Sequence, residues 1–289
     1  MDQHQILIAD CGATKSDWSL VEQGKITHRF MSVGISPIFQ TTNEIANEIK
    51  ERVLPQFQSA SLSAIYFYGA GCLPEKIEGV KKAIHLSFPI KKIEVYSDLI
   101  GAAHSLCGDE PGIACILGTG SNSCEWNGSD VTKQIPPLGY ILGDEGSGAY
   151  MGKLLVGNAL KNLLPQKLKD KFLKQYKLTP SIIIENVYKN PNPNRFLASI
   201  SPFLLQNIEE DAILQIVKKS FNDFFERNVM QYDFTNKTVH LVGSIAYHYA
   251  AILKKAASTK GINLGKIEQS PIEGLVKYYN TKNDWTPND

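Results

Sequence analysis

The pattern of apolar and polar positions in the first half of the chain predicts strands and helices in a definite order. A buried strand is expected over residues 6–9, and the turn Gln23-Gly24 joins strands over 17–21 and 26–31 into a hairpin. Thr41 and Glu44 form a capping box, and apolar residues then recur at helical spacing until Pro55. The other elements expected here are a strand over 64–68, a helix over 74–88, a strand over 93–96 and a helix over 99–107.

The second half of the chain begins with the same kind of pattern. Strands are expected over 113–117, 121–126 and 131–135, with Asn127-Gly128 as the turn between the last two. A run of helices follows from about Ser147, and in the clearest of them one face is apolar from Ile213 to Val229. A strand over 239–242, a helix over 246–257, a strand over 267–269 and a helix over 272–279 complete the second half. We therefore predict a duplicated strand-rich unit with helices inserted into its second copy.

Length and charge narrow the class of protein. The chain has 289 residues, which suits two domains better than one compact core. We expect an N-terminal domain over 1–110, joined by a C-terminal helix within 271–289, and a C-terminal domain over 111–270. The formal net charge of +1 gives no electrostatic reason to expect nucleic acid or a membrane as a partner. No apolar run reaches about 18 residues and the N-terminus lacks signal-peptide organisation, so a cytoplasmic protein is expected.

Several common chemistries lack their sequence signatures. The five cysteines, at 11, 72, 107, 115 and 124, match neither a disulfide framework nor paired metal-ligand spacing. The six histidines show no His-Glu-x-x-His spacing and no cysteine partners, which argues against a zinc site. There is also no Walker-type phosphate loop and no Gly-x-Gly-x-x-Gly turn that opens a helix after the first strand.

Two similar glycine-containing turns are the strongest candidate functional features. In residues 8–16 (IADCGATKS) and 115–123 (CILGTGSNS), an apolar run ends at a turn built from Gly with Thr or Ser. Glycine lets a ligand approach the backbone closely, and hydroxyl and N–H groups donate to phosphate oxygens. One such turn opens each half of the chain, so we expect the two halves to close on a nucleotide.

Five motifs together resemble the N-acetylglucosamine kinases of the sugar kinase, heat-shock chaperone and actin superfamily, a group that also contains dehydratase-activator ATPases. They are 10–15 (DCGATK), 97–103 (SDLIGAA), 118–122 (GTGSN), 143–147 (GDEGS) and 242–246 (VGSIA), and they occur in the order of the family. The resemblance implies an α/β fold with two ribonuclease H-like domains of the actin and hexokinase type and a nucleotide cleft between them. It also implies ATP and Mg²⁺ as cofactors.

The nucleotide-binding residues that the resemblance implies lie in three turns. Asp10 ends the first strand, where a carboxylate can hold Mg²⁺ through water and so neutralise charge on the transferred phosphate. By resemblance, the residues that contact the phosphates are Gly12, Thr14 and Lys15 in the first turn and Gly118, Thr119 and Gly120 in the second. Gly243 and Ser244 lie between a strand and a helix, a geometry that suits an adenosine site.

Asp98 is the predicted catalytic residue. It follows the strand over 93–96 and begins a helix, so it could be the N-cap of that helix. In the resembling kinases this position is the general base that accepts the proton of the attacking sugar hydroxyl. Phosphoryl transfer asks for positioning and charge stabilisation, so one placed carboxylate with Mg²⁺ and backbone donors would suffice. We favour the catalytic role over the capping role.

Four residues are predicted to contact the sugar. The resemblance gives Asn122 and Asp144 as partners of sugar hydroxyls, with Tyr140 either facing the substrate or closing the edge of the core. Ser36 lies in 34–38 (GISPI), where the animal enzymes carry a Ser-Thr-Asn segment that contacts the sugar. A hydroxyl donor therefore remains there, although the asparagine is missing.

Two functions follow from the resemblance. The first is an ATP-dependent kinase that phosphorylates the 6-hydroxyl of N-acetylglucosamine or a related amino sugar, such as glucosamine or N-acetylmuramic acid. The second is an ATPase that acts as a conformational activator of a partner enzyme, and the iron content of protein purified without oxygen would distinguish it. Activators use cysteines to bridge an iron–sulfur cluster and carry a different turn from 117–122 (LGTGSN), so the kinase is favoured. The expected partners are an amino sugar and ATP, and a homodimer is compatible with this assignment.

Overall fold

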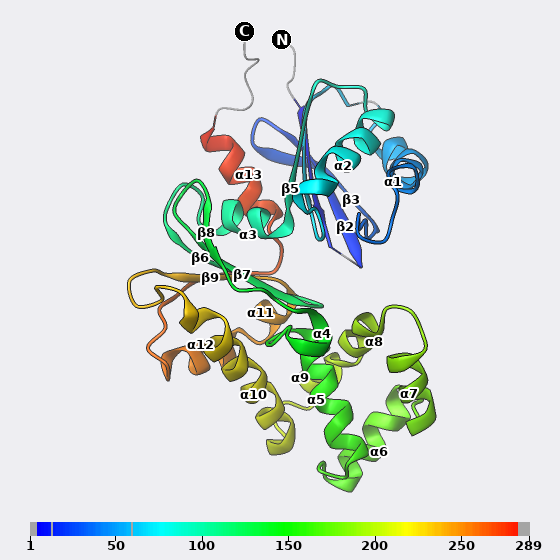
Figure 1. Cartoon of the computed structure of the whole chain (residues 1–289), viewed down its shortest axis with the longest axis vertical. Helices are drawn as coiled ribbons and strands as arrows, with labels where there is room; N and C mark the ends of the chain where they lie inside the picture. Colours follow the sequence, from blue (N-terminus) through cyan, green and yellow to red (C-terminus); the bar gives the residue numbers. More distant parts are fainter. Residues whose placement is uncertain (1–4, 13, 59, 283–289) are drawn as a thin grey trace. The chain divides into compact units, whose positions relative to one another are not determined.

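The computed structural model describes residues 5–12, 14–58 and 60–282 and divides the chain into two compact units. Unit 1 comprises Met1–Asp109 and Ser270–Asp289, and unit 2 comprises Glu110–Gln269. Each unit is built around its own mixed sheet with helices packed against it (Figure 1). Among the described residues, no helix is both long and apolar enough to span a bilayer.

The described part of unit 1 contains a five-stranded sheet in the order β3-β2-β1-β4-β5. Strands β1, β4 and β5 are parallel, whereas β2 and β3 are antiparallel to their neighbours. The strands are β1 (Gln5–Cys11), β2 (Lys15–Glu22), β3 (Lys25–Val33), β4 (Leu62–Gly69) and β5 (Lys92–Ser97); the helices are α1 (Thr42–Glu48), α2 (Pro74–Ser87), α3 (Asp98–Leu106) and α13 (Ile272–Thr281). The predicted hairpin is confirmed, with Gln23 and Gly24 both at positive φ.

The alternation of side chains along β1 gives unit 1 two apolar layers. Leu7 and Ala9 point to one face and belong to a buried cluster with residues of α1 and α2. Ile6 and Ile8 point to the other face, where Ile272 and other residues of α13 join their cluster. Figure 1 shows α13 (red) beside the strands, which agrees with this layering. The helix at the end of the chain therefore completes the core that the first strand begins.

The first helix begins as predicted but changes its winding. Thr41 Oγ1 accepts from the N–H of Glu44 at 3.3 Å, and Glu44 Oε2 accepts from the N–H of Thr41 at 2.7 Å, so the capping box is confirmed. Beyond α1, the chain forms a π-helical turn over Ile49–Val53 and a 3₁₀ turn over Leu54–Gln56. Pro55 has no N–H to donate to an α-helical partner, and its ring crowds the preceding turn, so regular winding is lost here.

The described part of unit 2 repeats the topology of unit 1. Its sheet has the order β8-β7-β6-β9-β10, with β6, β9 and β10 parallel and the hairpin strands antiparallel. The strands are β6 (Gly112–Leu117), β7 (Ser121–Trp126), β8 (Val131–Gln134), β9 (Val239–Val242) and β10 (Leu264–Glu268). The predicted duplication is therefore confirmed.

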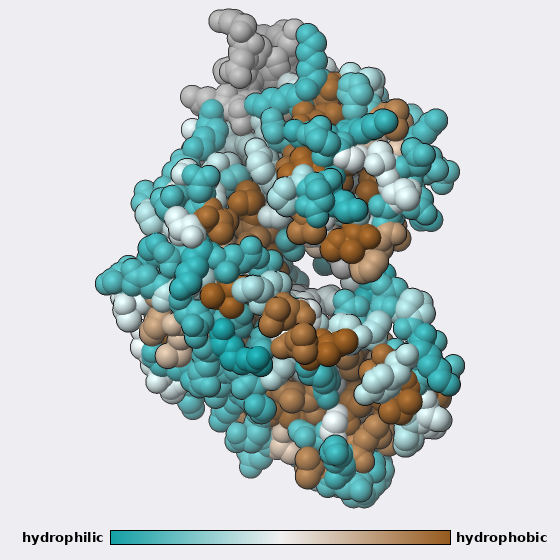
Figure 2. Space-filling view, in the orientation of Figure 1, coloured by the Kyte–Doolittle hydropathy of each residue, from teal (hydrophilic) through white to brown (hydrophobic). Residues whose placement is uncertain are grey.

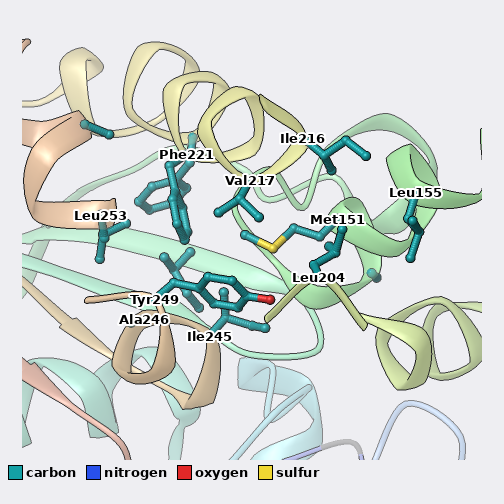
Figure 3. Packing of buried hydrophobic residues seen from close by; sticks show 14 of the residues in the cluster. Met151, Leu155, Leu204, Ile216, Val217, Phe221, Ile245, Ala246, Tyr249 and Leu253 are labelled. Carbon is teal, nitrogen blue, oxygen red and sulfur yellow. The ribbon is translucent and has the colours of Figure 1, made fainter. Parts of the chain in front are cut away.

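The helices of unit 2 lie mainly between β8 and β9 in sequence. They are α4 (Gly139–Leu142), α5 (Gly148–Leu160), α6 (Gln166–Gln175), α7 (Pro180–Tyr188), α8 (Pro193–Ile200), α9 (Pro202–Gln206) and α10 (Asp211–Arg227), followed after β9 by α11 (Ser244–His248) and α12 (Ala250–Ser258). Figure 3 shows Met151 of α5 close to Val217 of α10, in a cluster that also contains Leu204 and Ile245. The predicted apolar face of α10 is thus the face that packs into the core.

One helix that was predicted to be continuous is interrupted in the structure. The helix expected over 246–257 is two helices, α11 and α12, separated at Tyr249, which has φ −105° and ψ 19°. Tyr249 is 3% exposed, and its ring meets that of Phe221 edge to face, with centroids 6.1 Å apart. Burial of this large ring against α10 accompanies the change in direction, which a period of 3.6 residues does not reveal.

Candidate active site

Asp10 lies near the carboxyl end of β1 in unit 1, with polar neighbours on the adjacent strands. It is half-buried, and the register places it opposite Asp17 of β2 and beside Tyr68 of β4. Residues paired in this way point to the same face of a sheet. Three polar side chains therefore form a row at the end of the face that α13 covers.

Burial and neighbouring charges hold the pKa of Asp10 high. Burial is the largest cause, and the carboxylates of Asp98 and Asp17 add to it, whereas Lys15 and Arg29 oppose it; together they raise the pKa to about 7. Asp17 is itself paired with Arg29, whose Nε donates to Asp17 Oδ1 at 2.9 Å. A cation beside Asp10 would therefore offset the repulsion from its neighbouring carboxylates.

The turn after Asp10 exposes the side chains that were predicted to contact phosphates. Gly12 donates its N–H to the carbonyl oxygen of Lys15 at 2.9 Å, and Gly34 donates to that of Thr14 at 3.1 Å. Thr14 and Lys15 are exposed. A Cβ placed on Gly12 would make only an ordinary contact, 3.5 Å from the Lys15 carbonyl oxygen. The packing of the protein around Gly12 would therefore tolerate a larger residue. Close approach of a ligand to the backbone is a separate reason for glycine at this position.

Asp98 is not the N-cap of α3. That position belongs to Ser97, whose Oγ accepts from the N–H of Ile100 at 3.3 Å. Asp98 is the first helical residue and is half-buried. Burial raises the pKa of its carboxyl group, against the lowering effect of the backbone N–H groups of Leu99 and of Asp98 itself. The capping role considered from the sequence is therefore filled by its neighbour.

Ser36 lies in a tight turn, where its backbone is fully engaged. Its N–H donates to Gln40 Oε1 at 2.8 Å, and its carbonyl oxygen accepts from the N–H groups of Phe39 and Gln40. The residue is 6% exposed, and its Oγ is 3.5 Å from where a Cβ on Gly71 would lie. Little of its hydroxyl therefore reaches the surface of unit 1.

In unit 2, the turn from Gly118 to Gly120 joins β6 to β7 and rests on the start of α5. The carbonyl oxygens of Gly118 and Thr119 accept from the N–H groups of Gly148 and Ala149 at 2.9 and 3.0 Å. The N–H groups of Thr119 and Gly120 donate to no residue that the structure describes. A Cβ on Gly118 would meet nothing within 4 Å. The turn thus presents unused donors and open space, as a phosphate-binding turn requires.

Asp144 is fixed against this turn by its own backbone. It is 8% exposed and has φ +56°, a conformation that side chains other than those of Gly, Asn and Asp rarely adopt. Its Oδ1 accepts from the N–H of Ser121 at 3.2 Å, and its Oδ2 accepts from no described residue. A Cβ on Gly120 would lie 3.1 Å from Oδ2, so glycine there gives the carboxylate its space.

Asn122 and Tyr140, also in unit 2, are partly committed to local structure. Asn122 Oδ1 accepts from the N–H of Ser123 at 2.9 Å and from Gln134 Nε2 at 3.1 Å, while its Nδ2 donates to no described residue. Tyr140 is half-buried and packs against the core of unit 2, as expected for a residue at the core boundary. Around it, Leu138, Ile141 and Leu142 are exposed. Figure 2 shows apolar side chains gathered in patches on a largely hydrophilic surface.

Gly243 is required by the fold of unit 2. It has φ +123°, and a Cβ there would lie 2.3 Å from the carbonyl oxygen of Leu117. Its N–H donates to the carbonyl oxygen of Glu268 at 2.9 Å. The glycine is therefore explained by packing between β6 and α11, while Ser244, which begins α11, is exposed.

No family model and no curated protein matches the chain. Among solved structures, a Porphyromonas gingivalis protein named "Putative N-acetylglucosamine Kinase" is 46% identical, with a TM-score of 0.94 over 96% of this chain and 99% of that one. The chain belongs to the N-acetylglucosamine kinase family of sugar kinases.

More distant members of this fold agree in architecture. A protein of the same name from Chromobacterium violaceum has a TM-score of 0.71 at 16% identity, over 96% of this chain and 99% of that one. A ROK family glucokinase from Streptomyces griseus, solved with glucose and AMPPNP, has a TM-score of 0.60 at 13% identity, over 96% and 98%. The predicted α/β fold of the actin and hexokinase type is therefore confirmed.

The family motif over 143–147 contains a second acidic residue, to which sequence reasoning gave no role. Glu145 is 4% exposed, and its Oε1 is 2.6 Å from Arg227 Nη1. Arg227 lies about eighty residues away at the end of α10. The only signal in the sequence was the pair of adjacent acidic residues, Asp144 and Glu145, which does not identify a partner. The pair of Asp17 with Arg29, which joins β2 to β3 within the hairpin, was also not predicted.

The residues of unit 1 fit a family kinase that uses Mg²⁺. The described residues contain no group of three or more His, Cys, Asp or Glu side chains suited to hold a metal ion. Mg²⁺ in phosphoryl-transfer sites keeps several waters and takes one or two carboxylates, with the remaining ligands from phosphates. The half-buried Asp10, crowded by other carboxylates, is a donor of this kind.

Proposed function

We propose that the chain transfers the γ-phosphoryl group of ATP to the 6-hydroxyl of N-acetylglucosamine or of a related amino sugar, such as glucosamine or N-acetylmuramic acid. The observation that carries the proposal is the state of Asp98: a half-buried carboxylate at the carboxyl end of β5 whose capping duty is filled by Ser97. Family membership supports the kinase activity, and the residues described above support the assignment of individual roles.

In this proposal, Asp98 acts as the general base. As the sugar oxygen bonds to the γ-phosphorus, the bond from that phosphorus to the β,γ-bridging oxygen breaks, ADP leaves and the hydroxyl proton passes to Asp98. Its raised pKa makes Asp98 a stronger proton acceptor than an ordinary aspartate. Mg²⁺ held by Asp10, through water, would neutralise charge on the phosphates.

Nucleotide binding is assigned to the exposed donors of the turns. Thr14 and Lys15, with the backbone at Gly12, would bind phosphate oxygens in unit 1. The unused N–H groups of Thr119 and Gly120, with the open approach at Gly118, would do so in unit 2. Gly243 and Ser244 would lie against adenosine, with Ser244 as the exposed member.

Sugar binding is assigned chiefly to Asp144 and Asn122. Asp144 Oδ2 is a free acceptor, and Asn122 Nδ2 is a free donor, among the described residues. An acceptor and a donor of this kind suit vicinal hydroxyls or an N-acetyl carbonyl. Tyr140 would add an aromatic contact, and Ser36 would add a hydroxyl through the small part of the residue that is exposed.

An assay of ADP release tests the proposal. The protein is supplied with ATP, Mg²⁺ and, one at a time, N-acetylglucosamine, glucosamine, N-acetylmuramic acid, N-acetylmannosamine and glucose. We expect turnover to depend on sugar and to be fastest with one of the first three. Equal ATP turnover with and without sugar would contradict a kinase and favour the activator function.

The cysteines give no support to the activator function. All five lie in the described part of the chain; Cys11, Cys72, Cys115 and Cys124 are buried, and Cys107 is half-buried. A cluster bridged between subunits needs cysteines at an accessible surface. Iron analysis of protein purified without oxygen is therefore expected to find no cluster.

A further inference from the structure

Glu145 lies next to the predicted sugar-binding residue in sequence but makes its contacts with a distant helix. Its Oε1 is 2.6 Å from Arg227 Nη1, and its Oε2 accepts from Asn228 Nδ2 at 3.3 Å. Arg227 is the last residue of α10, and Asn228 is its C-cap, with 5% of its surface exposed. One carboxylate thus joins the loop over 143–147 to the end of α10.

This loop has two residues in the left-handed region of backbone conformation and packs directly against α10. Asp144 has φ +56° and Gly146 has φ +79°. A Cβ on Gly146 would lie 2.9 Å from Cβ of Phe224, so the loop runs directly against α10. Glycine adopts positive φ without strain, so Asp144 is the residue of the two whose conformation is helped by contacts from outside the loop. The loop therefore needs contacts from outside itself to keep the Asp144 carboxylate beside Gly120.

Stability alone is a weak explanation for the ion pair of Glu145. The Glu145 carboxylate is buried, but the Arg227 side chain is 57% exposed, so water screens the attraction between the two charges. Glu145 also places a second negative charge beside Asp144, which a neutral residue would avoid. The contacts of Glu145 with Arg227 and Asn228 are directional, so they fix the position of the loop more precisely than an apolar side chain would.

The other flank of the loop is held by a second ionic side chain. Lys153 of α5 donates from Nζ to the carbonyl oxygens of Tyr140 and Ile141, at 3.0 and 3.4 Å. These carbonyls belong to α4, which ends just before Gly143. The segment that carries Asp144 is therefore tied to α5 before the aspartate and to α10 after it.

We propose that Glu145 is a positioning residue for sugar binding, which through Arg227 and Asn228 holds the Asp144 carboxylate in its place beside Gly120. The inference rests on the proposed function, because it takes Asp144 to bind the sugar. It predicts that loss of the ion pair weakens sugar binding and leaves nucleotide binding almost unchanged.

The test measures KM for sugar and for ATP, kcat and Tm in a set of variants. Arg227→Met removes the charge of a side chain that is 57% exposed, so we expect folded protein. We expect its sugar KM to rise about five- to tenfold, with the ATP KM within about twofold of the parent. Arg227→Lys should recover most of the loss, since it restores a cation. Glu145→Gln should resemble Arg227→Met.

Two further variants make the result decisive. Glu226→Gln breaks the neighbouring surface pair of α10 with Lys260 and should leave the sugar KM unchanged. Asp144→Asn tolerates positive φ and should raise the sugar KM at least about tenfold. An unchanged sugar KM in Arg227→Met and Glu145→Gln, beside a raised one in Asp144→Asn, would overturn the positioning role alone. An unchanged sugar KM in Asp144→Asn would overturn both the sugar role of Asp144 and the positioning role.

Discussion

Ser97 caps α3, so the carboxylate of Asp98 is not needed for capping and is available for catalysis. Ser97 accepts the hydrogen bond that caps α3, and Asp98 keeps a half-buried carboxylate with a raised pKa. Asparagine at position 98 has nearly the same shape but cannot take up a proton at neutral pH. Asp98→Asn is therefore expected to lower kcat about a hundredfold or more, with sugar and nucleotide affinities within about threefold, as measured by steady-state kinetics and calorimetry.

The capping variant provides the control for this prediction. Ser97→Ala should lower the free energy of unfolding by about 1 kcal/mol through loss of the cap, as measured by urea denaturation. Asp98→Asn should not show such a loss, because the cap remains. Full activity in Asp98→Asn would remove the residue from the mechanism.

Two glycines of unit 2 are expected to respond differently to the same substitution. Gly118 has open space at its Cα, whereas a Cβ on Gly243 would lie 2.3 Å from the Leu117 carbonyl oxygen at φ +123°. Gly118→Ala should therefore raise the ATP KM about tenfold with an unfolding free energy within about 0.5 kcal/mol of the parent. Gly243→Ala should lose about 3 kcal/mol or more. A comparable loss of stability in Gly118→Ala would assign that glycine to the fold and not to a ligand.

The features of helices and strands that were predicted correctly are those that depend on residues close together in the sequence. The capping box of Thr41 and Glu44 and the Gln23-Gly24 turn depend on neighbouring residues, and both are present. The break at Tyr249 depends on the core of α10, and it was missed. Helical periodicity reports which face is buried, but it does not report where a buried ring redirects the chain.

Helix α13 covers one face of the first sheet through a buried aromatic cluster that sequence reasoning did not find. The Tyr68 hydroxyl is 2.9 Å from His104 Nδ1 and also contacts the Tyr279 hydroxyl. The His104 ring stacks on Tyr278 with centroids 4.2 Å apart and meets Tyr96 edge to face. The cluster joins β4, β5, α3 and α13, so its protonation affects the packing of the whole face.

This cluster makes the stability of unit 1 depend on pH. Burial lowers the pKa of His104 to about 4; Lys282 also lowers it, and Asp109 raises it. A histidine in the unfolded chain titrates near about 6.5. The unfolded chain therefore binds the extra proton first, so this stabilisation is present above about pH 6.5 and is lost as pH falls toward about 4. Between pH 7 and 5, His104 should account for a loss of about 2 kcal/mol.

The matched variant His104→Asn isolates this effect from the titration of carboxylates. Asparagine can still bond to the Tyr68 hydroxyl but does not titrate, so its unfolding free energy should fall less between pH 7 and 5. Denaturant unfolding at several pH values, followed by tyrosine fluorescence, measures the difference. Equal slopes for the parent and the variant would show that His104 does not carry this dependence.

Across the two units, the sequence predicted which strands end in polar residues, but it did not predict the contacts that position the side chains of the site. Asp10 and Asp98 each lie at or just after the end of a parallel strand, which the pattern of buried strands made visible. The contacts of Asp144 could not be predicted, because Ser121 and the partners of Glu145 come from β7 and α10. Contacts between distant segments depend on packing, which a single sequence does not display.

The repeated topology of the two units and the 46% identity to a family member give the chain its class, while the amino sugar and its 6-hydroxyl as the acceptor are proposals. The most direct test is proton–phosphorus correlation NMR of the product formed from ATP, Mg²⁺ and N-acetylglucosamine, or the best amino sugar of the panel. We expect one phosphosugar for each ADP, with its phosphorus coupled to the protons on carbon 6. Inorganic phosphate as the sole product, or coupling to another sugar carbon, would contradict it.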